Sequence, residues 1–213
     1  MAINYSIFFI SFFSGILIIP FCIYYSRKTG RVLDISQGDA LKIHQNPTSL
    51  LGGMGILLAT LLGLLFAFDS SLVFLIMGML VIFMLGFWDD IRWKGAVSVN
   101  PLFKFAVLII CSFMAAIALG YIGVSIVLVF MAIFICINAV NYQDGMDGLA
   151  GGLVAISLVG FFMVGAPPFS LVTSGAVVAF LLFNLPPAKI FMGDSGAYLL
   201  GFILAALACV VAQ

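Results

Sequence analysis

The feature that most constrains this chain is a series of eight long apolar stretches separated by short polar segments. Each stretch approaches the roughly 20 residues that an α-helix needs to cross the hydrocarbon of a bilayer. The stretches run over residues 6–25, 51–68, 71–88, 101–119, 122–139, 149–165, 169–185 and 197–212. They lack the period-two alternation of a membrane β-strand. The pattern predicts an all-α, polytopic integral membrane protein with about eight transmembrane helices.

The scarcity of charge supports this fold class and excludes some functions. Only 8% of the 213 residues are charged, whereas about a quarter are charged in an ordinary soluble domain. Eight Lys and Arg balance eight Asp, so the chain has no basic field for nucleic acid, and the lipid bilayer is its expected surroundings. The four cysteines lie in apolar stretches without metal-site spacing, which favours apolar packing over a disulfide or zinc.

The basic residues predict how the chain is oriented. Residues 1–6 contain no Lys or Arg, which argues against a cleavable signal peptide, whereas Arg27, Lys28 and Arg31 follow the first apolar stretch. Positive residues favour the cytoplasmic side, so the N-terminus is expected outside. Alternating helices then place residues 26–50, 89–100, 140–148 and 186–196 in the cytoplasm. All eight basic residues fall in these segments or within about one turn of them.

The same alternation of helices across the membrane also places most of the acidic residues on one side. Five aspartates from three separate segments fall at the cytoplasmic ends of helices: Asp89, Asp90, Asp144, Asp147 and Asp194. The outer turns contain one charge, Asp69. This convergence of carboxylates on one membrane face is the strongest indication of function in the sequence.

The first motif is the pair Asp89 and Asp90, which ends the third apolar stretch. Adjacent carboxylates repel each other unless a proton or a cation relieves them. Mg²⁺ prefers such oxygen ligands together with phosphate oxygens. The alternative is a solvated helix end, with Arg92 and Lys94 as local counter-ions.

The second motif is the polar, glycine-rich segment 138–152, which contains Asn141, Asp144 and Asp147. Glycines permit a close approach of backbone to a ligand, and the N–H groups that open the next helix offer an anion site. Irregular polar backbone at membrane depth is tolerated where it lines a cavity. A plain polar connector is the alternative.

The third motif is segment 184–197, in which Pro186 and Pro187 end one helix. Asp194 then stands at the start of the next helix, where it either completes a metal site or caps its own helix. Phe191 either stacks on a nucleobase or faces lipid. Asn184 opens the segment.

The fourth motif is segment 42–55, where Lys42, His44 and Thr48 precede a run of glycines. A basic, hydroxyl-bearing loop of this kind suits phosphate. His44 is the only histidine in the chain, and the alternative for it is an exposed loop residue. Together the four motifs describe a divalent-metal phosphate site that suits joining a soluble phosphorylated donor to a lipid phosphate.

The residues that carry these motifs resemble the polyprenyl-phosphate N-acetylhexosamine-1-phosphate transferase family, glycosyltransferase family 4. This family includes the bacterial initiators of peptidoglycan, teichoic acid and O-antigen (lipopolysaccharide) synthesis. The matching segments are His44-x-x-Pro47-Thr48-x-x-x-Gly52-Gly53, Gly86-Phe87-x-Asp89-Asp90, Asn138-Ala139-x-Asn141-x-x-Asp144-Gly145-x-Asp147-Gly148 and Phe191-Met192-Gly193-Asp194-Ser195-Gly196.

The resemblance implies a reaction at the cytoplasmic face of the cell's inner membrane. Polyprenyl (undecaprenyl) phosphate would attack the sugar-linked phosphorus of a UDP-N-acetylhexosamine, with Mg²⁺ or Mn²⁺ as cofactor, and release UMP. Asp89 and Asp90 would be catalytic, Asp194 and Asp90 would hold the metal, and whether Asp89 is base or nucleophile stays open. The nucleotide and substrate would be held by Asn141, Asp144, Asp147, Asn184, Phe191, Lys42, His44 and Thr48. A homodimer is left open.

The chain departs from the family pattern at its C-terminal end. Members usually have ten or eleven helices and a His-rich cytoplasmic segment, whereas residues 1–213 are expected to form a single transferase-like domain that lacks them. The alternative to an active transferase is therefore a truncated, inactive member acting as a scaffold or subunit. A carrier fits less well, because carrier sites usually lie near the midplane of the membrane. The sugar is not specified, and GlcNAc is the commonest choice.

Overall fold

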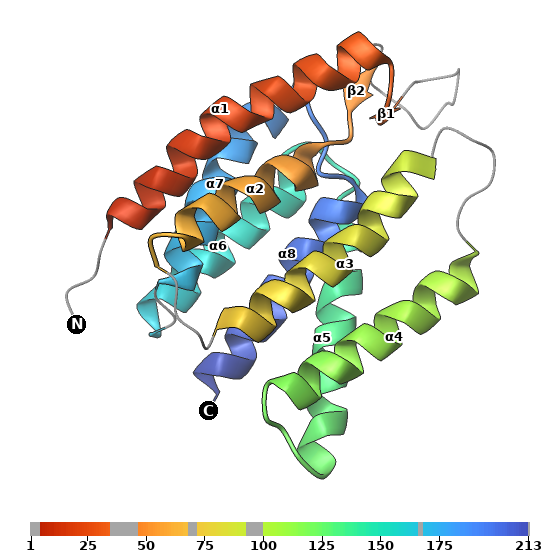
Figure 1. Ribbon diagram of the computed structural model, residues 1–213, viewed down its shortest axis with the longest axis vertical. Helices are drawn as coiled ribbons and strands as arrows, with labels where there is room; N and C mark the ends of the chain where they lie inside the picture. Colours follow the sequence, from red (N-terminus) through yellow and green to blue (C-terminus); the bar gives the residue numbers. More distant parts are fainter. Residues whose placement is uncertain (1–4, 35–46, 68–71, 93–99, 166–167, 213) are drawn as a thin grey trace.

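The computed structural model describes residues 5–34, 47–67, 72–92, 100–165 and 168–212 (Figure 1). Eight helices and two short strands lie within these residues. The helices are α1 Ser6–Thr29, α2 Gly52–Leu64, α3 Val73–Arg92, α4 Pro101–Ala118, α5 Val124–Gln143, α6 Leu149–Met163, α7 Phe169–Asn184 and α8 Gly193–Val211. The strands are β1 Leu33–Asp34 and β2 Thr48–Ser49. The predicted all-α membrane fold is confirmed.

Four of the helices are long and apolar enough to cross a bilayer on their own: α1, α4, α5 and α8. Three apolar helices are shorter, and α2, with 13 residues, is only about 20 Å long at 1.5 Å per residue. Eight apolar segments thus form eight helices, but several of these do not reach the full thickness of the hydrocarbon. The number of complete spans and their orientation stay predictions.

Helix α8 is the centre of the bundle. It packs against α3, α5 and α2, while α1 packs against α7 and α2, and α4 lies outside α5 and α3 (Figure 1). Most residues of α8 are buried, whereas few residues of α4 and α5 are. Exposed apolar faces on outer helices are what a bilayer would cover.

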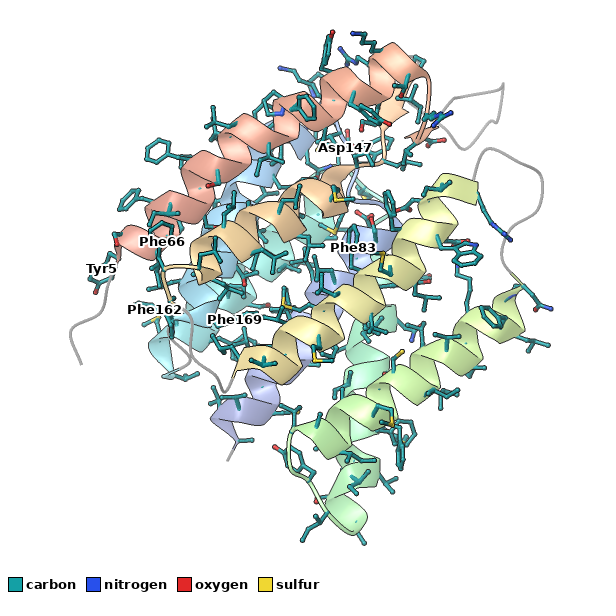
Figure 2. All side chains as sticks on the ribbon, viewed as in Figure 1. Tyr5, Phe66, Phe83, Asp147, Phe162 and Phe169 are labelled. Atoms are coloured by element: carbon teal, nitrogen blue, oxygen red, sulfur yellow. The ribbon has the colours of Figure 1, made fainter. Side chains whose placement is uncertain are left out.

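The two ends of the bundle differ in chemistry. Figure 2 shows Asp147 near one end, whereas Tyr5, Phe66 and Phe162 gather at the opposite end. The rings of Tyr5 and Phe162 contact edge to face, with centroids 6.3 Å apart. Tyrosine is enriched at membrane interfaces, so we expect Tyr5 to lie near the headgroups at this end.

Small residues bring α1 and α7 close together. A Cβ atom added at Gly15 would lie 2.6 Å from the Cβ of Ala179, so the two helices are in contact through glycine and alanine. Membrane helices associate through such small residues, because apolar burial gives no advantage in lipid. The four cysteines are all free, as their apolar surroundings predict.

The two strands are a feature that hydrophobic patterning does not predict. Leu33 pairs with Ser49 and Asp34 pairs with Thr48 in an antiparallel ladder, and Ser49 also forms a parallel bridge with Ile190. The hydroxyl groups of Ser26 and Ser49 are 2.8 Å apart and share a hydrogen bond. This small sheet ties the end of α1 to the segment that leads into α8.

Candidate active site

The site forms where α3 ends against the beginning of α8. Gly86 makes this approach possible, because a Cβ atom there would lie 2.5 Å from the Cα of Ser195 and 2.6 Å from the carbonyl carbon of Asp194. The close contact brings the carboxylates at the end of α3 to the first turn of α8.

The Asp90 side chain caps α8 from a neighbouring helix. Its two carboxylate oxygens accept the backbone N–H groups of Asp194 at 2.8 Å and Ser195 at 3.0 Å. The first N–H groups of a helix have no partner within it and carry partial positive charge, so a carboxylate stabilises them. These bonds stabilise the start of α8 at Gly193, beside Asp194, which the sequence placed at the start of this helix although the apolar stretch begins only at residue 197. Asp194 does not cap its own helix.

Lys104 joins two of the predicted site aspartates. Its ammonium group forms ion pairs with Asp89 and, at 3.2 Å, with Asp194. Lys104 lies in the first turn of α4, whose N-cap Asn100 accepts the N–H of Leu102 at 2.9 Å. A positive charge therefore lies between carboxylates contributed by α3 and α8.

Asn141 holds the other oxygen of Asp194. Its side-chain amide donates to Asp194 Oδ1 at 2.9 Å from the last turn of α5. We call Lys104, Asp89, Asp194 and Asn141 the Lys104 cluster. Four helices, α3, α4, α5 and α8, each contribute one side chain to it, so the predicted convergence of separate segments is present in the structure.

Asp144 extends the acidic surroundings of the cluster. It is the residue that follows α5, and it lies partly buried in the turn between α5 and α6. Burial first, and then the charges of Asp194, Asp90 and Asp147, raise the pKa of its carboxyl to about 8. A protonated Asp144 is therefore expected near neutral pH until a cation lowers its pKa.

Asn184 and Asp147 connect the two polar loops. The buried Asn184 amide accepts the N–H of Gly148 at 3.0 Å and donates to the carbonyl of Ile190 at 2.9 Å. The Asp147 carboxylate accepts the N–H of Ala188 at 3.2 Å. These contacts hold the 144–148 turn beside the segment that carries Asp194. A role for either residue in binding nucleotide stays a prediction.

Two further predicted residues, Phe191 and Thr48, lie at the same end of the bundle. Phe191 is partly buried, its N–H donates to the Ser49 carbonyl at 2.7 Å, and its own carbonyl accepts the N–H of Gly52 at 3.0 Å. Thr48 is buried in β2. Lys42 and His44 lie outside the described residues.

Comparison with known proteins agrees with this arrangement. The sequence profile of glycosyl transferase family 4 matches residues 72–212, two thirds of the chain. The chain belongs to this family. The matched region contains α3 to α8, and therefore all four members of the Lys104 cluster.

Individual relatives support the assignment. The phospho-N-acetylmuramoyl-pentapeptide-transferase of Dictyoglomus thermophilum is 30% identical over 228 residues, which cover 96% of this chain and 73% of the relative. The protein of the same name from Bacillus thuringiensis is 43% identical over 83 residues, which cover 36% of this chain and 26% of the relative. The chain is thus a multi-pass membrane protein of a transferase family.

The donor set of the Lys104 cluster is compatible with the divalent cation that the resemblance implies. Asp89 and Asp194 already converge on one positive group, the Lys104 ammonium. Mg²⁺ is commonly held by one or two carboxylates plus phosphate oxygens of the substrate. Among the described residues, no three His, Cys, Asp or Glu side chains form a complete metal cage. A cation at this site would therefore rely on substrate phosphates for its remaining ligands.

Lys104 is a site residue that lies outside the four sequence motifs. The signal was available, because Lys104 is the only charged residue between Pro101 and Ala118 in an otherwise apolar helix. An ionisable residue inside a membrane helix is by default a functional candidate. Ser195 and Gly193 were missed for another reason, since their contacts with Asp90 depend on packing between segments about 100 residues apart.

Proposed function

We propose that the chain transfers a sugar-1-phosphate from a UDP-sugar to polyprenyl phosphate at the cytoplasmic face of the inner membrane. The observation that carries this proposal is the Lys104 cluster, in which carboxylates from two helices flank a positive charge at the end of the bundle. Such an end site is accessible both to a soluble nucleotide and to a phosphate at the membrane surface. The family assignment supports the same chemistry.

The proposed reaction needs few protein groups. An oxygen of the lipid phosphate attacks the sugar-linked phosphorus of the donor, the bond between the two donor phosphates breaks, and UMP leaves. The products are polyprenyl diphospho-sugar and UMP. Phosphoryl transfer depends mainly on positioning and on neutralisation of charge, both of which this cluster offers.

The proposed roles follow from the contacts of each side chain. Asp89 lies beside Lys104, where it would accept a proton from the lipid phosphate or orient that phosphate. Asp194, fixed by Asn141, would hold Mg²⁺ together with donor phosphates. When bound, Mg²⁺ would neutralise the charge that develops on the bridging phosphate oxygen. Lys104 would add positive charge beside the same phosphates.

Asp90 would have a positioning role in addition to the metal role that the resemblance implies. Both of its oxygens accept backbone N–H groups of α8, so it fixes the direction in which Asp194 leaves the helix. The 144–148 turn and the segment around Phe191, joined by Asn184, would form the walls that hold the nucleotide.

The names of the relatives favour a specific donor. Both relatives act, by name, on phospho-N-acetylmuramoyl-pentapeptide. We therefore propose UDP-N-acetylmuramoyl-pentapeptide as the first donor to test and UDP-GlcNAc as the second. The corresponding process would be the first membrane step of cell-wall glycan synthesis.

The test is release of UMP by the purified chain in detergent or nanodiscs, with undecaprenyl phosphate, Mg²⁺ and each donor in turn. UMP release that requires both the lipid phosphate and one of the donors supports the proposal. A folded, monodisperse chain that releases no UMP from either donor contradicts it and favours the scaffold alternative. Labelling of cysteines introduced at Gly120 and Lys189 tests the orientation, since position 120 is expected outside and position 189 inside.

A further inference from the structure

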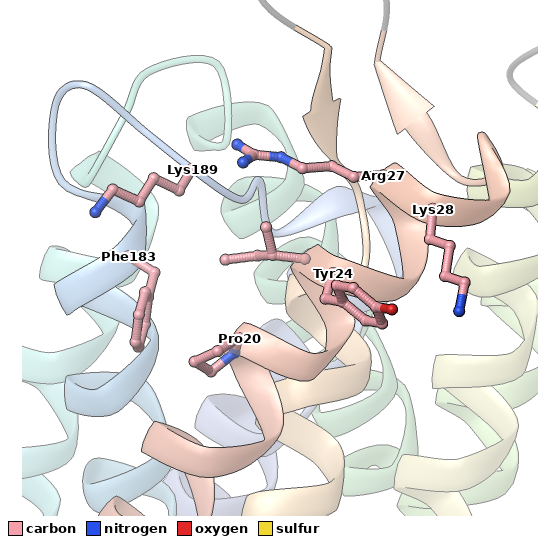
Figure 3. A pocket seen from close by; sticks show the side chains of 7 residues that line it. Pro20, Tyr24, Arg27, Lys28, Phe183 and Lys189 are labelled. Carbon is pink, nitrogen blue, oxygen red and sulfur yellow. The ribbon is translucent and has the colours of Figure 1, made fainter.

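A second candidate site lies between the last turns of α1 and α7, away from the Lys104 cluster. The structure has a cavity of about 560 Å³ there, which we call the α1–α7 pocket (Figure 3). Its walls include Pro20, Tyr24, Arg27, Lys28, Phe183 and Lys189. None of these residues belongs to the Lys104 cluster or is among the residues proposed for the transfer reaction.

The walls of the α1–α7 pocket are fixed by backbone and hydroxyl contacts. The N–H of Lys189 donates to the carbonyl of Phe183 at 2.8 Å, which holds the loop against the end of α7. On the other side, the hydrogen bond between Ser26 and Ser49 ties α1 to β2. Because Ser49 also accepts the N–H of Phe191, the same strand connects both walls. The pocket is therefore part of the packed structure.

The upper part of the pocket is positively charged. Figure 3 shows the side chains of Arg27 and Lys189 extending over the same side of the pocket from two different segments. Lys28 lies on the other side of Tyr24, with its ammonium 5.4 Å from the centre of that ring. Among the residues that the structure describes, those lining the pocket include no acidic side chain. Positive charges on the same side of a pocket repel each other, so a bound anion near Arg27 and Lys189 would be favourable.

The lower part of the pocket is apolar. Figure 3 shows Pro20 and Phe183 below Arg27 and Lys189, and the buried Ile23 also lines the pocket. A free inorganic phosphate would gain nothing from these apolar side chains. A molecule with a phosphate group and an attached hydrocarbon chain would contact both parts, because basic pockets between membrane helices bind anionic headgroups in this way.

We propose that the α1–α7 pocket binds an anionic phospholipid of the bilayer, with its phosphate near Arg27 and Lys189 and an acyl chain over Pro20 and Phe183. Tyr24 would lie at the level of the headgroups, as tyrosines do at membrane interfaces. This site is independent of the proposed transfer reaction, because it uses neither the Lys104 cluster nor a nucleotide. It adds a lipid ligand to the fold.

The test measures lipid binding to the full chain in detergent, without nucleotide or polyprenyl phosphate. Native mass spectrometry would compare phosphatidylglycerol with phosphatidylcholine, and a parallel arm would replace the lipid by inorganic phosphate. The double variant Arg27→Gln with Lys189→Gln removes the pocket charges. Arg31→Gln is the matched control, since Arg31 is an exposed arginine just beyond α1 that does not line the pocket. Arg27→Lys with Lys189→Arg keeps the charge.

The proposal expects one phosphatidylglycerol molecule to be retained in preference to phosphatidylcholine. Its affinity should fall on the order of tenfold or more in the double glutamine variant, since each basic residue near a membrane surface contributes about 1 kcal/mol. Arg31→Gln and the charge-retaining variant should bind as the unmodified chain does. Equal loss in Arg31→Gln, no loss in the double glutamine variant, or equal occupancy by inorganic phosphate alone would each overturn the proposal.

Discussion

The Asp90 carboxylate accepts the backbone N–H of Asp194 at 2.8 Å, so the last turn of α3 caps the first turn of α8. The two aspartates are 104 residues apart in the chain. One of them therefore orients the other, and the position of the proposed metal ligand depends on a neighbouring helix as well as on its own.

Because Asp90 caps α8, we expect two substitutions at this position to lower the free energy of unfolding by different amounts. Asp90→Ala removes both acceptors from the buried start of α8, and a buried donor without a partner costs about 1–3 kcal/mol. Asp90→Asn keeps one acceptor oxygen and should cost less. Thermal or denaturant unfolding in detergent measures both free energies. Asp89→Ala, the adjacent position, should affect stability less than Asp90→Ala, because the ion-pair partner of Asp89, Lys104, would keep Asp194 as a partner. Equal stability of Asp90→Ala and the unmodified chain would contradict the cap.

Lys104 predicts a change in cation binding. If its ammonium occupies the carboxylates that also attract a divalent cation, Lys104→Met should strengthen the binding of Mn²⁺, a spectroscopic substitute for Mg²⁺, while UMP release falls. Removal of a like charge a few ångströms away is expected to tighten binding roughly tenfold. Titration followed by electron paramagnetic resonance measures the affinity. Arg92→Met, at the exposed end of α3 where Arg92 stacks on Trp88, is the control. Weaker Mn²⁺ binding in Lys104→Met would show that the lysine supports the cation instead.

Because Gly86 lies against the backbone of α8, we expect a larger side chain at this position to destabilise the packing of α3 against α8. Gly86→Ala would place a methyl group 2.5 Å from the Cα of Ser195, and helix backbone cannot move aside as a flexible side chain can. A cost of about 1–3 kcal/mol in unfolding free energy is expected. Gly78→Ala, on the same helix, meets the ring of Phe202 and should cost less, whereas Gly160→Ala meets nothing within 4 Å. If all three variants are equally stable, α3 and α8 do not approach as closely as described.

Asp144 predicts a pH dependence of nucleotide binding. The pKa of its carboxyl is raised to about 8, mainly by burial, so the folded chain retains a proton there between about pH 4 and pH 8. Binding of UDP with Mg²⁺ should release this proton, and affinity should therefore rise with pH up to about 8 by as much as roughly tenfold per unit. Calorimetry in buffers of different ionisation enthalpy counts the protons released. Asp144→Asn should flatten the pH profile, and an unchanged profile in that variant would assign the dependence to another group.

Much of the fold follows from local patterns in the sequence. Apolar stretches of near-span length predict all eight helices, and the prolines at 186 and 187 correctly place the end of α7 at Asn184. The grouping of Asp89, Asp194 and Asn141 also follows, because alternating helices bring their ends to one side. Each helix depends on one segment at a time, and the grouping of the side chains depends only on which side of the membrane each helix ends.

Features that depend on contacts between distant segments were not predicted. Asp90 caps the start of α8 from another helix, and the amide of Asn184 joins two loops. The two-residue strands carry too little pattern to be recognised. Lys104 is an intermediate case: its charge in an apolar helix was visible, but its partners became clear only from the packing of α4 against α3.

The most direct test of the central claim is the Mg²⁺ dependence of UMP release in Asp194→Asn. The substitution keeps the size of the side chain and removes the charge between Asn141 and Lys104. The account predicts that release falls by at least about a hundredfold, as expected when a group that holds the reacting phosphates is lost, while Asp34→Asn, in β1, retains activity. Undiminished, Mg²⁺-dependent release in Asp194→Asn would show that the Lys104 cluster is not the site of transfer.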